Sequence, residues 1–229
     1  YTPGPRLVMG HFGSLSSTRT LKPLMHAWHW LEQHEPRVSR DLELHIFGGT
    51  LDDSSAQLAQ QWGLLDRIRP FGRLETDPAT GESGRSQVLR RMRQCDVLLL
   101  VHGENAICEE YIPSKVYEYL WMQRPILATV HDNPQMAEIL RGQGHWVAQS
   151  SLREGGSELA APEMARHLKA LWGQFRWPQK RPAKPFGAFR SIPIMPKISS
   201  QTLPISSTAP RACRRARAMA PSWHRPTPW

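Results

Sequence analysis

The sequence predicts an α/β protein built on a doubly wound parallel sheet. Short apolar runs alternate with amphipathic stretches over about residues 1–175, which is the pattern of consecutive β-α-β units. The most apolar run, DVLLLV at residues 96–101, does not alternate with polar residues, which is typical of a central strand covered by helices on both faces. About six such runs with helices between them, in about 175 residues, indicate a doubly wound sheet.

The predicted strands are short apolar runs that end at turn residues. The first reads LVMGHF, and the second, LELHIF, is closed by Gly48 and Gly49. The later runs are shorter, and each is followed by a stretch with a helical period. The predicted strands cover residues 7–12, 42–47, 67–71, 96–101, 126–130 and 146–148.

The predicted helices lie between these strands. Apolar residues recur at intervals of three and four over residues 21–31, as one face of a helix requires. Later helices have recognisable starts. The Asp52-Asp53 pair or Ser54 can cap one helix, Asn133 can cap another, and Pro113 fits a first helical position. The expected helices lie near residues 21–31, 53–65, 85–93, 113–122, 133–140 and 162–172.

The charge divides the chain into two parts. Residues 176–229 hold 11 of the 29 Lys and Arg, none of the 20 Asp and Glu, and 10 of the 20 prolines. We therefore predict a folded domain over 1–175, with a net charge of −2, and a disordered basic tail over 176–229. Alternatives for the tail are contact with nucleic acid or acidic lipid through the arginines of 211–217, and out-of-frame translation.

Three classes of protein are disfavoured by composition. No run of 18 apolar residues could form a membrane-spanning helix. The three cysteines are far apart, so we expect a reducing compartment rather than a disulfide framework. The histidines of the first helix, His26, His29 and His34, are better explained as a solvated face than as a metal site.

Two loops are expected to form the functional site. In a doubly wound sheet, ligands bind beyond the carboxyl ends of the strands, where the strand order reverses. The loops after the first and fourth strands, near residues 12–19 and 102–114, should therefore meet. The first contains Gly13, Ser14 and Arg19, which could present backbone amides and a cation to a phosphate. It matches neither common phosphate-loop motif, and no acidic residue closes the second strand, which argues against a nicotinamide dinucleotide.

The second loop leads into a helix with the features of an anion site. With Pro113 at the first helical position, the amides of Ser114 and Lys115 would be free at the helix N-terminus. Glu118 lies one turn further on, where it could share a cleft with Lys115. A carboxylate beside a phosphate site is suited to bind a ribose diol. The alternative is an ordinary Lys–Glu surface pair.

Several motifs in this region occur together in one known family. Glu110 and Glu118 form an E-x7-E pair within the segment IPSKVYEYL…RPILA of residues 112–128. Residues 13–19 carry a G-S-L…R loop, and Phe71-Gly72 form an F-G pair. In these motifs and their order, residues 6–172 resemble the C-terminal, nucleotide-sugar-binding domain of GT-B-fold glycosyltransferases, in particular glycosyltransferase family 4. The resemblance implies a Rossmann-like domain that is half of a longer enzyme.

The resemblance implies a role for each matched residue. Gly13 and Ser14 would offer amides to the diphosphate, and Arg19 would stand where the commoner motif has a phosphate-binding lysine. The amides around Pro113–Lys115 would lie near the phosphates, and Phe71 and Gly72 near the base. Glu118 would hold the ribose hydroxyls, and Glu110, the candidate catalytic residue, would lie near the donor sugar. The commoner motif has an arginine at Ser14, and our hypothesis is that Lys115 compensates for that missing cation.

The implied activity is transfer of a sugar, with retention of configuration, from a nucleotide diphosphate sugar to a polysaccharide or lipid-linked acceptor. The resemblance implies no cofactor and no essential metal. We expect a cytoplasmic protein, reaching the inner face of the cell membrane through a missing N-terminal acceptor domain, and a chain that is inactive by itself. No specific nucleic-acid partner is expected. The alternatives are a GT-B-fold nucleotide-sugar 2-epimerase and a non-catalytic nucleotide-binding module.

Overall fold

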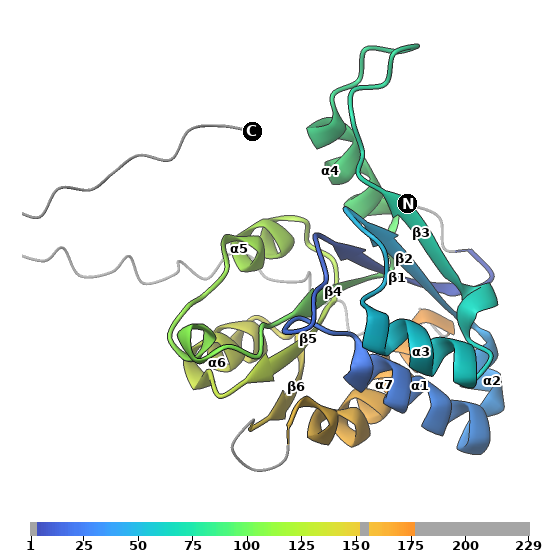
Figure 1. Ribbon diagram of the computed structural model, residues 1–229, viewed down its shortest axis with the longest axis vertical. Helices are drawn as coiled ribbons and strands as arrows, with labels where there is room; N and C mark the ends of the chain where they lie inside the picture. The colour runs from blue at the N-terminus through green and yellow to red at the C-terminus, as the bar shows by residue number, and fades with distance from the viewer. Residues whose placement is uncertain (1–3, 152–155, 177–229) are drawn as a thin grey trace, which may run out of the picture. The chain divides into compact units, whose positions relative to one another are not determined.

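A six-stranded parallel sheet forms the centre of the protein (Figure 1). The computed structural model describes residues 4–151 and 156–176. The strand order is β3-β2-β1-β4-β5-β6, and every neighbouring pair is parallel. This order reverses between β1 and β4, so the predicted doubly wound, Rossmann-like sheet is confirmed. The strands are β1 (Leu7–Phe12), β2 (Leu42–Phe47), β3 (Ile68–Gly72), β4 (Val97–Val101), β5 (Ile126–His131) and β6 (Trp146–Ser150).

The first two strands have the predicted bounds. The third is shifted by one residue at both ends, and the others differ by one or two residues at one end. The fourth strand begins at Val97, one residue after the predicted start at Asp96. The Asp96 carboxylate accepts a hydrogen bond from the backbone N–H of Val8 at 2.7 Å, and its own N–H donates to the Val8 carbonyl at 2.9 Å. Asp96 thus ties the start of β4 to β1.

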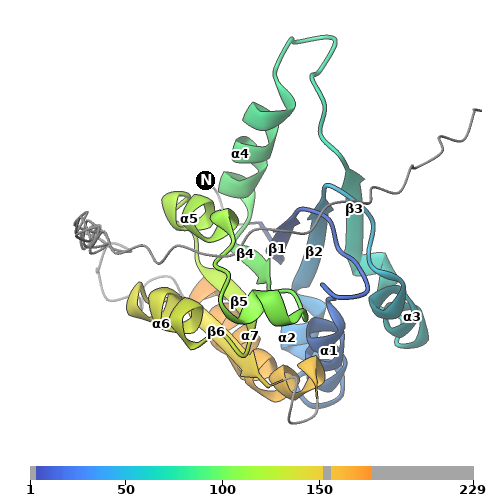
Figure 2. The ribbon, with the colours of Figure 1, turned by 60° about the vertical axis from the view of Figure 1, so that its left-hand side comes forward.

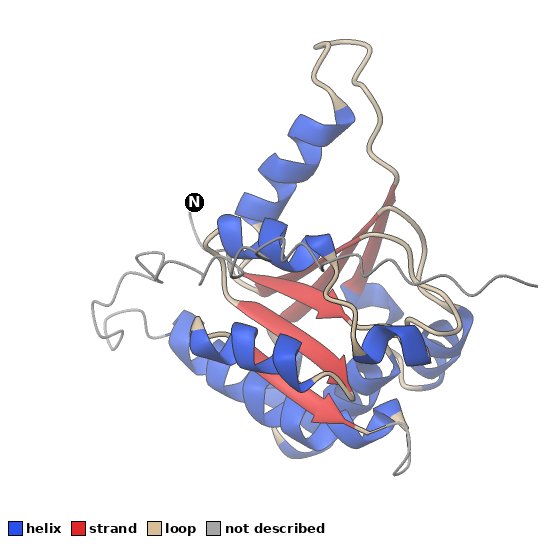
Figure 3. Cartoon of the chain, turned by 90° about the vertical axis from the view of Figure 1, so that its left-hand side faces the viewer, coloured by secondary structure: helices blue, strands red, loops and turns tan. Residues whose placement is uncertain are grey.

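Helices cover both faces of the sheet (Figures 2 and 3). One face packs against four helices and the other against three, as the two clusters of buried side chains record. Short 3-10 turns precede β3, α5 and α7. The first layer consists of α1 (Lys22–His34), α2 (Pro36–Arg40), α3 (Asp53–Gln61) and α7 (Ala161–Arg176), and the second of α4 (Gly84–Gln94), α5 (Ser114–Trp121) and α6 (Pro134–Gly142).

The helix caps agree in part with the sequence. Asn133 caps α6 as predicted, and its side chain accepts a hydrogen bond from the Met136 N–H. The cap of α3 is Asp52, the first residue of the predicted Asp52-Asp53 pair, and not Asp53 or Ser54. Asp52 has the extended backbone of an N-cap residue, and its carboxylate accepts from the Ser55 N–H at 3.0 Å. The same carboxylate also accepts from the Leu21 N–H at 3.1 Å, so it ties α3 to the start of α1.

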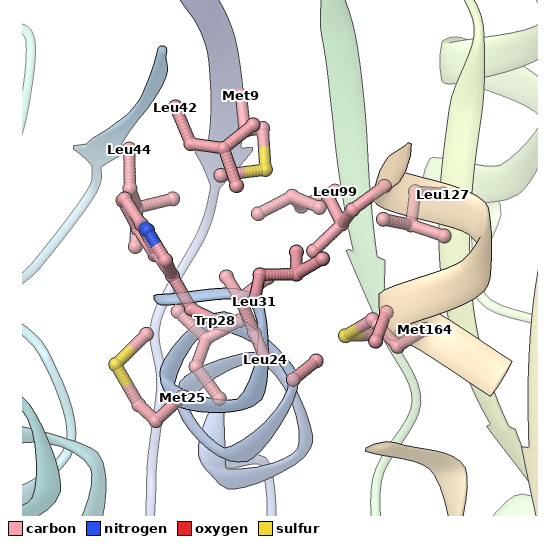
Figure 4. Close-up of a cluster of buried hydrophobic side chains, with 14 of the residues drawn as sticks. Met9, Leu24, Met25, Trp28, Leu31, Leu42, Leu44, Leu99, Leu127 and Met164 are labelled. Atoms are coloured by element: carbon pink, nitrogen blue, oxygen red, sulfur yellow. The ribbon is translucent and has the colours of Figure 1, made fainter. Parts of the chain in front are cut away.

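The larger core lies between the sheet and the α1 side (Figure 4). Trp28 of α1 is fully buried there, beside leucines from the central strands. Its indole N–H donates to the Ser39 carbonyl at 3.3 Å, and the Arg67 guanidinium lies 5.3 Å from the ring centroid. Burying a ring of this size is a major source of stability, and the bonded N–H removes the cost of burying a donor.

Two further predictions concern membrane-spanning helices and the C-terminal tail. No helix among residues 4–151 and 156–176 is long and apolar enough to cross a membrane. The last described helix ends at Arg176. Apart from Arg176, the predicted tail of 176–229 lies outside the described residues, so its disorder stays a prediction.

Replacement of Trp28 tests this core. We expect Trp28→Ala to lower the free energy of unfolding by about 3–5 kcal/mol, because it removes a fully buried ring and its hydrogen bond. Urea denaturation followed by circular dichroism measures the change. Trp30→Ala, on the same helix but 45% exposed, is the matched control and should change stability by no more than about 0.5 kcal/mol. Similar losses in both variants would contradict the packing described here.

Candidate functional site

The loops after β1 and β4 meet at the carboxyl edge of the sheet, as the sequence predicts. The Glu104 N–H donates to the Thr18 carbonyl at 2.7 Å. The Thr20 hydroxyl donates to the Glu104 carboxylate at 3.4 Å. This contact lies beside the reversal of strand order, so the candidate residues on the two loops share one region of the surface.

Helix α5 is bound to the end of β1 through both backbone polar groups of one residue, Phe12. The Lys115 ammonium donates a hydrogen bond to the Phe12 carbonyl, and the Phe12 N–H donates to the Tyr119 hydroxyl at 3.1 Å. Lys115 and Tyr119 are one helical turn apart, so both side chains lie on the same face of α5. Burial raises the pKa of Tyr119, which keeps its hydroxyl protonated.

Gly13 lies where these elements crowd together. Its φ of 138° is in the region that glycine adopts readily, and its N–H donates to the Phe47 carbonyl at 2.7 Å. A Cβ added at Gly13 would lie 2.5 Å from the Lys115 Nζ, and one added at Gly48 would lie 3.1 Å from the Gly13 Cα. The turn after β1 therefore has room for backbone alone, and Lys115 lies directly over it.

The rest of the first loop is open to solvent. Ser14 and Arg19 are both exposed. A tight turn links the backbones of Ser16 and Arg19 by two reciprocal hydrogen bonds of 3.1 and 3.0 Å. Gly103, at the end of β4, lies near the Arg19 guanidinium, since a Cβ added there would be 3.9 Å from the Arg19 Nη2. Arg19 thus stands between the two loops, as a cation available to a ligand would.

The N-terminus of α5 differs by one residue from the expectation. Pro113 is the N-cap rather than the first helical residue, because its ψ of 138° is extended. Its carbonyl accepts from the Val116 N–H at 2.9 Å. Ser114 and Lys115 then occupy the first two helical positions, whose N–H groups have no acceptor within a helix. With Pro113 as the N-cap, the N–H groups of Ser114 and Lys115 still have no acceptor within α5.

The two glutamates of the E-x7-E pair have different surroundings. Glu110 is exposed on the loop before α5. Glu118 is mostly buried, and one of its carboxylate oxygens forms an ion pair with Arg85 at the start of α4. Arg85 has no counterpart among the residues predicted for the site. The helices α4 and α5 that carry this pair lie side by side (Figure 2).

Phe71 and Gly72 end β3, further along the same edge. Phe71 stacks on Phe47 with centroids 4.7 Å apart, and Phe47 stacks on Phe12 at 4.6 Å. Phe71 is 39% exposed, and the Arg91 guanidinium lies 5.6 Å from its centroid. The Gly72 carbonyl accepts from the Gly48 N–H at 2.7 Å. A row of stacked rings thus joins the outer strand to β1, and its last member is partly open.

Three histidines lie at the ends of three neighbouring strands, a feature that the sequence analysis missed. His11, His102 and His131 stand at or just after the ends of β1, β4 and β5, and all are buried. The sequence signal was a histidine at each of these strand ends, in GHF, VHG and VHD. Within the described ranges, no group of three or more metal-ligating side chains comes together.

Burial sets the charge of the site's ionisable groups. It lowers the pKa of His11 to about 4, with a smaller contribution from the Lys115 charge, and it lowers the pKa of His131 to about 4. Burial also lowers the pKa of Lys115, although the Glu118 carboxylate opposes that shift. The buried histidines are therefore neutral at pH 7, and the positive charges come from lysine and arginine.

Comparisons with known proteins find similarity only among solved structures. No family model matches the sequence, and no curated protein matches it. WaaG, a glycosyltransferase involved in lipopolysaccharide biosynthesis, is similar with 15% identity and a TM-score of 0.48, over 78% of this chain and 44% of that one. A TarM mutant from S. aureus, in complex with fondaparinux, α-GlcNAc-glycerol and UDP, has 12% identity and a TM-score of 0.46, over 75% and 30%. HepE of Anabaena, in complex with UDP and glucose, has 17% identity and a TM-score of 0.44, over 74% and 44%. This chain spans less than half the length of each.

The neutral histidines predict a loss of stability in acid. The unfolded chain binds a proton at His11 below about pH 6.5, whereas the folded chain binds it only near pH 4, so stability is full above pH 6.5 and falls as the pH drops. Between pH 7.5 and pH 5, His11 alone should cost about 2 kcal/mol. Urea titrations at the two pH values should show that His11→Asn loses less stability than the parent. His34→Asn, at an exposed position on α1, should keep the parent's loss. A His11→Asn loss equal to the parent's would contradict this assignment.

Proposed function

We propose that this chain is the donor-nucleotide half of a retaining GT-B glycosyltransferase of the hexosyltransferase kind, related to family 4. The enzyme would move a sugar from a nucleotide diphosphate sugar to a polysaccharide or lipid-linked acceptor. One observation carries the proposal. The Lys115 ammonium, on the first turn of α5, lies over the Gly13 turn and binds the Phe12 carbonyl at the end of β1, and Glu118 lies one helical turn further along α5.

The diphosphate would be bound by backbone amides and fixed cations. The Lys115 ammonium lies where a side chain at Gly13 would, so a phosphate at this turn would meet that charge, and the first amides of α5 would add donors at the positive end of a helix dipole. Lys115 and Arg19 would supply positive charge from the two loops. The commoner motif has an arginine at the position of Ser14. Lys115 would supply the missing positive charge, because its ammonium lies directly over the Gly13 turn.

The ribose and the sugar would be bound by the two glutamates. Glu118 has one carboxylate oxygen on Arg85, which leaves the other to accept a hydrogen bond from a ribose hydroxyl. Arg85 would hold the carboxylate in a fixed orientation while it does so. Glu110, exposed on the loop before α5, would face the donor sugar. The base would lie toward Phe71 and Gly72, where the row of stacked rings ends in a partly open face.

The chemical step follows from these positions. The bond between the anomeric carbon and the diphosphate oxygen breaks, and the electron pair leaves with the nucleoside diphosphate. Positive charge develops on the sugar ring and negative charge on the leaving oxygen. Fixed amides and cations around the diphosphate stabilise that negative charge without reorganising. The acceptor oxygen forms the new bond on the face that the diphosphate leaves, and its proton is lost to a base or to the departing phosphate.

The remaining parts of the enzyme would come from outside this chain. An N-terminal acceptor domain would bind the sugar acceptor and close over the donor, so the chain by itself would bind nucleotide weakly and not turn over. Contact with the inner face of a membrane would depend on that domain. This transfer would need no metal ion, since backbone amides and fixed cations would neutralise the charge of the diphosphate.

A nucleotide titration tests the donor site. Thermal melts of the full chain with UDP, GDP, ADP and TDP should show stabilisation by one of them, of about 2.7 kcal/mol at 100 times its dissociation constant. Glu118→Ala should remove the shift, because the ribose loses its acceptor. Glu138→Ala, exposed on α6, is the matched control and should keep it. If no nucleoside diphosphate shifts a cooperative melt, the proposal is wrong.

The role of Lys115 can be tested separately. Lys115→Met keeps the aliphatic stem over Gly13 but removes the charge. We expect it to weaken nucleoside diphosphate binding about tenfold or more, since charge-assisted hydrogen bonds contribute about 1.5–3 kcal/mol. Isothermal titration calorimetry measures the affinity. Equal affinity in the variant and the parent would show that another group supplies the missing cation.

A further inference from the structure

The loop between β4 and α5 has few buried side chains to define its shape. Ile107 is 76% exposed and Tyr111 is 53% exposed, and Glu110 between them is exposed as well. Cys108 is the buried side chain of this stretch. A segment with so little packing opens easily unless its backbone is bound elsewhere. The hydrogen bonds of this backbone therefore decide where Glu110 and the start of α5 lie.

Asn133 binds that backbone from the turn between β5 and α6. The side chain is 1% exposed. Its amide nitrogen donates to the Cys108 carbonyl at 2.9 Å and to the Tyr111 carbonyl at 3.2 Å. Its oxygen accepts from the Met136 N–H at 2.9 Å, which caps α6. Both amide hydrogens and the oxygen are thus in use, and a flipped amide would place its oxygen against two carbonyls.

His102 lies at the same two carbonyls. It is fully buried, and its Nδ1 accepts from the His131 N–H at 3.2 Å. The Tyr111 and Cys108 carbonyls raise its pKa, but burial outweighs them and the pKa is lowered. The neutral ring therefore carries its proton on Nε2. Among the described residues, the His102 Nε2 has no hydrogen-bond partner, so the direct hydrogen bonds to these two carbonyls come from Asn133.

We propose that Asn133 is a positioning residue for the donor site. By holding the carbonyls of Cys108 and Tyr111, it sets the backbone on each side of Glu110 and the approach to Pro113. The amides of Ser114 and Lys115 follow directly from there. Asn133 acts through the loop backbone, and its role rests on the proposed function of that loop in binding a nucleotide diphosphate sugar.

Substitution can separate the two functions of Asn133, which are to cap α6 and to bind the loop backbone. Asparagine, aspartate and serine all cap helices well, so Asn133→Asp and Asn133→Ser should both preserve the start of α6. Aspartate, however, replaces the donating nitrogen by an oxygen that faces two carbonyls. Serine is too short to reach them. Both variants therefore release the loop while they keep the cap.

The experiment uses the full 229-residue chain. Calorimetric titration with the nucleoside diphosphate that binds the parent should give an affinity at least tenfold weaker for Asn133→Asp, because small displacements of positioned groups are costly. Amide hydrogen exchange across residues 106–113 should become faster. Asn133→Ser should give the same loss of affinity and the same faster exchange. If Asn133→Asp does not fold, the Asn133→Ser variant alone tests the proposal. Val38→Ala, buried in α2 on the opposite layer, is the control that lowers the melting temperature without changing the affinity.

A second readout separates positioning from general loss of structure. The loop would contact the phosphates and the sugar, whereas Glu118 would bind the ribose. Asn133→Asp should therefore weaken the nucleoside diphosphate and leave the affinity of the bare nucleoside, measured by NMR titration, within twofold of the parent. Equal loss for both ligands, or no loss for the diphosphate, overturns the assignment of Asn133. If the parent binds no nucleoside diphosphate, the proposed function is wrong, and the role assigned to Asn133 is then wrong as well.

Discussion

The docking of α5 onto the end of β1 is the interaction on which the candidate site depends. At Phe12 the strand has left its ladder with β4, whose pairing with β1 ends at His11. The Phe12 N–H and carbonyl would be left without partners in a buried place, which is costly. Tyr119 and Lys115 of α5 bind these two groups. One residue of β1 thereby binds α5 at two points, one helical turn apart.

This arrangement restricts the residues around it. Gly13 must follow Phe12 because the Lys115 ammonium occupies the space of a side chain. Gly48 lies beside Gly13, and a Cβ added at Gly48 would be only 3.1 Å from the Gly13 Cα. Stacked rings continue the contact outward from Phe12 through Phe47 to Phe71. Two glycines therefore lie at the centre of this edge, and aromatic rings lie toward β3.

Burial decides which ionisable side chains near this edge are charged at pH 7. Residues 1–175 have slightly more acidic than basic side chains, yet Arg19, Arg85 and Lys115 converge on the meeting point of the two loops. The buried histidines add no positive charge at pH 7, since burial lowers the pKa of His11 and His131. Glu118 is the carboxylate within this basic region, and its pairing with Arg85 offsets part of the cost of burying it.

The sequence by itself determined the architecture. The apolar runs predicted all six strands, and the strand ends predicted which two loops meet, because period and run length are local properties. It also singled out Gly13, Lys115 and Glu118 from their motifs. Only the tertiary structure decided what those residues contact. That Lys115 bonds to Phe12, Glu118 to Arg85 and Asn133 to a loop 22 to 25 residues away follows from packing between distant segments. Such pairings leave no periodic trace, because a hydrogen bond between separate elements depends on where the sheet brings their ends.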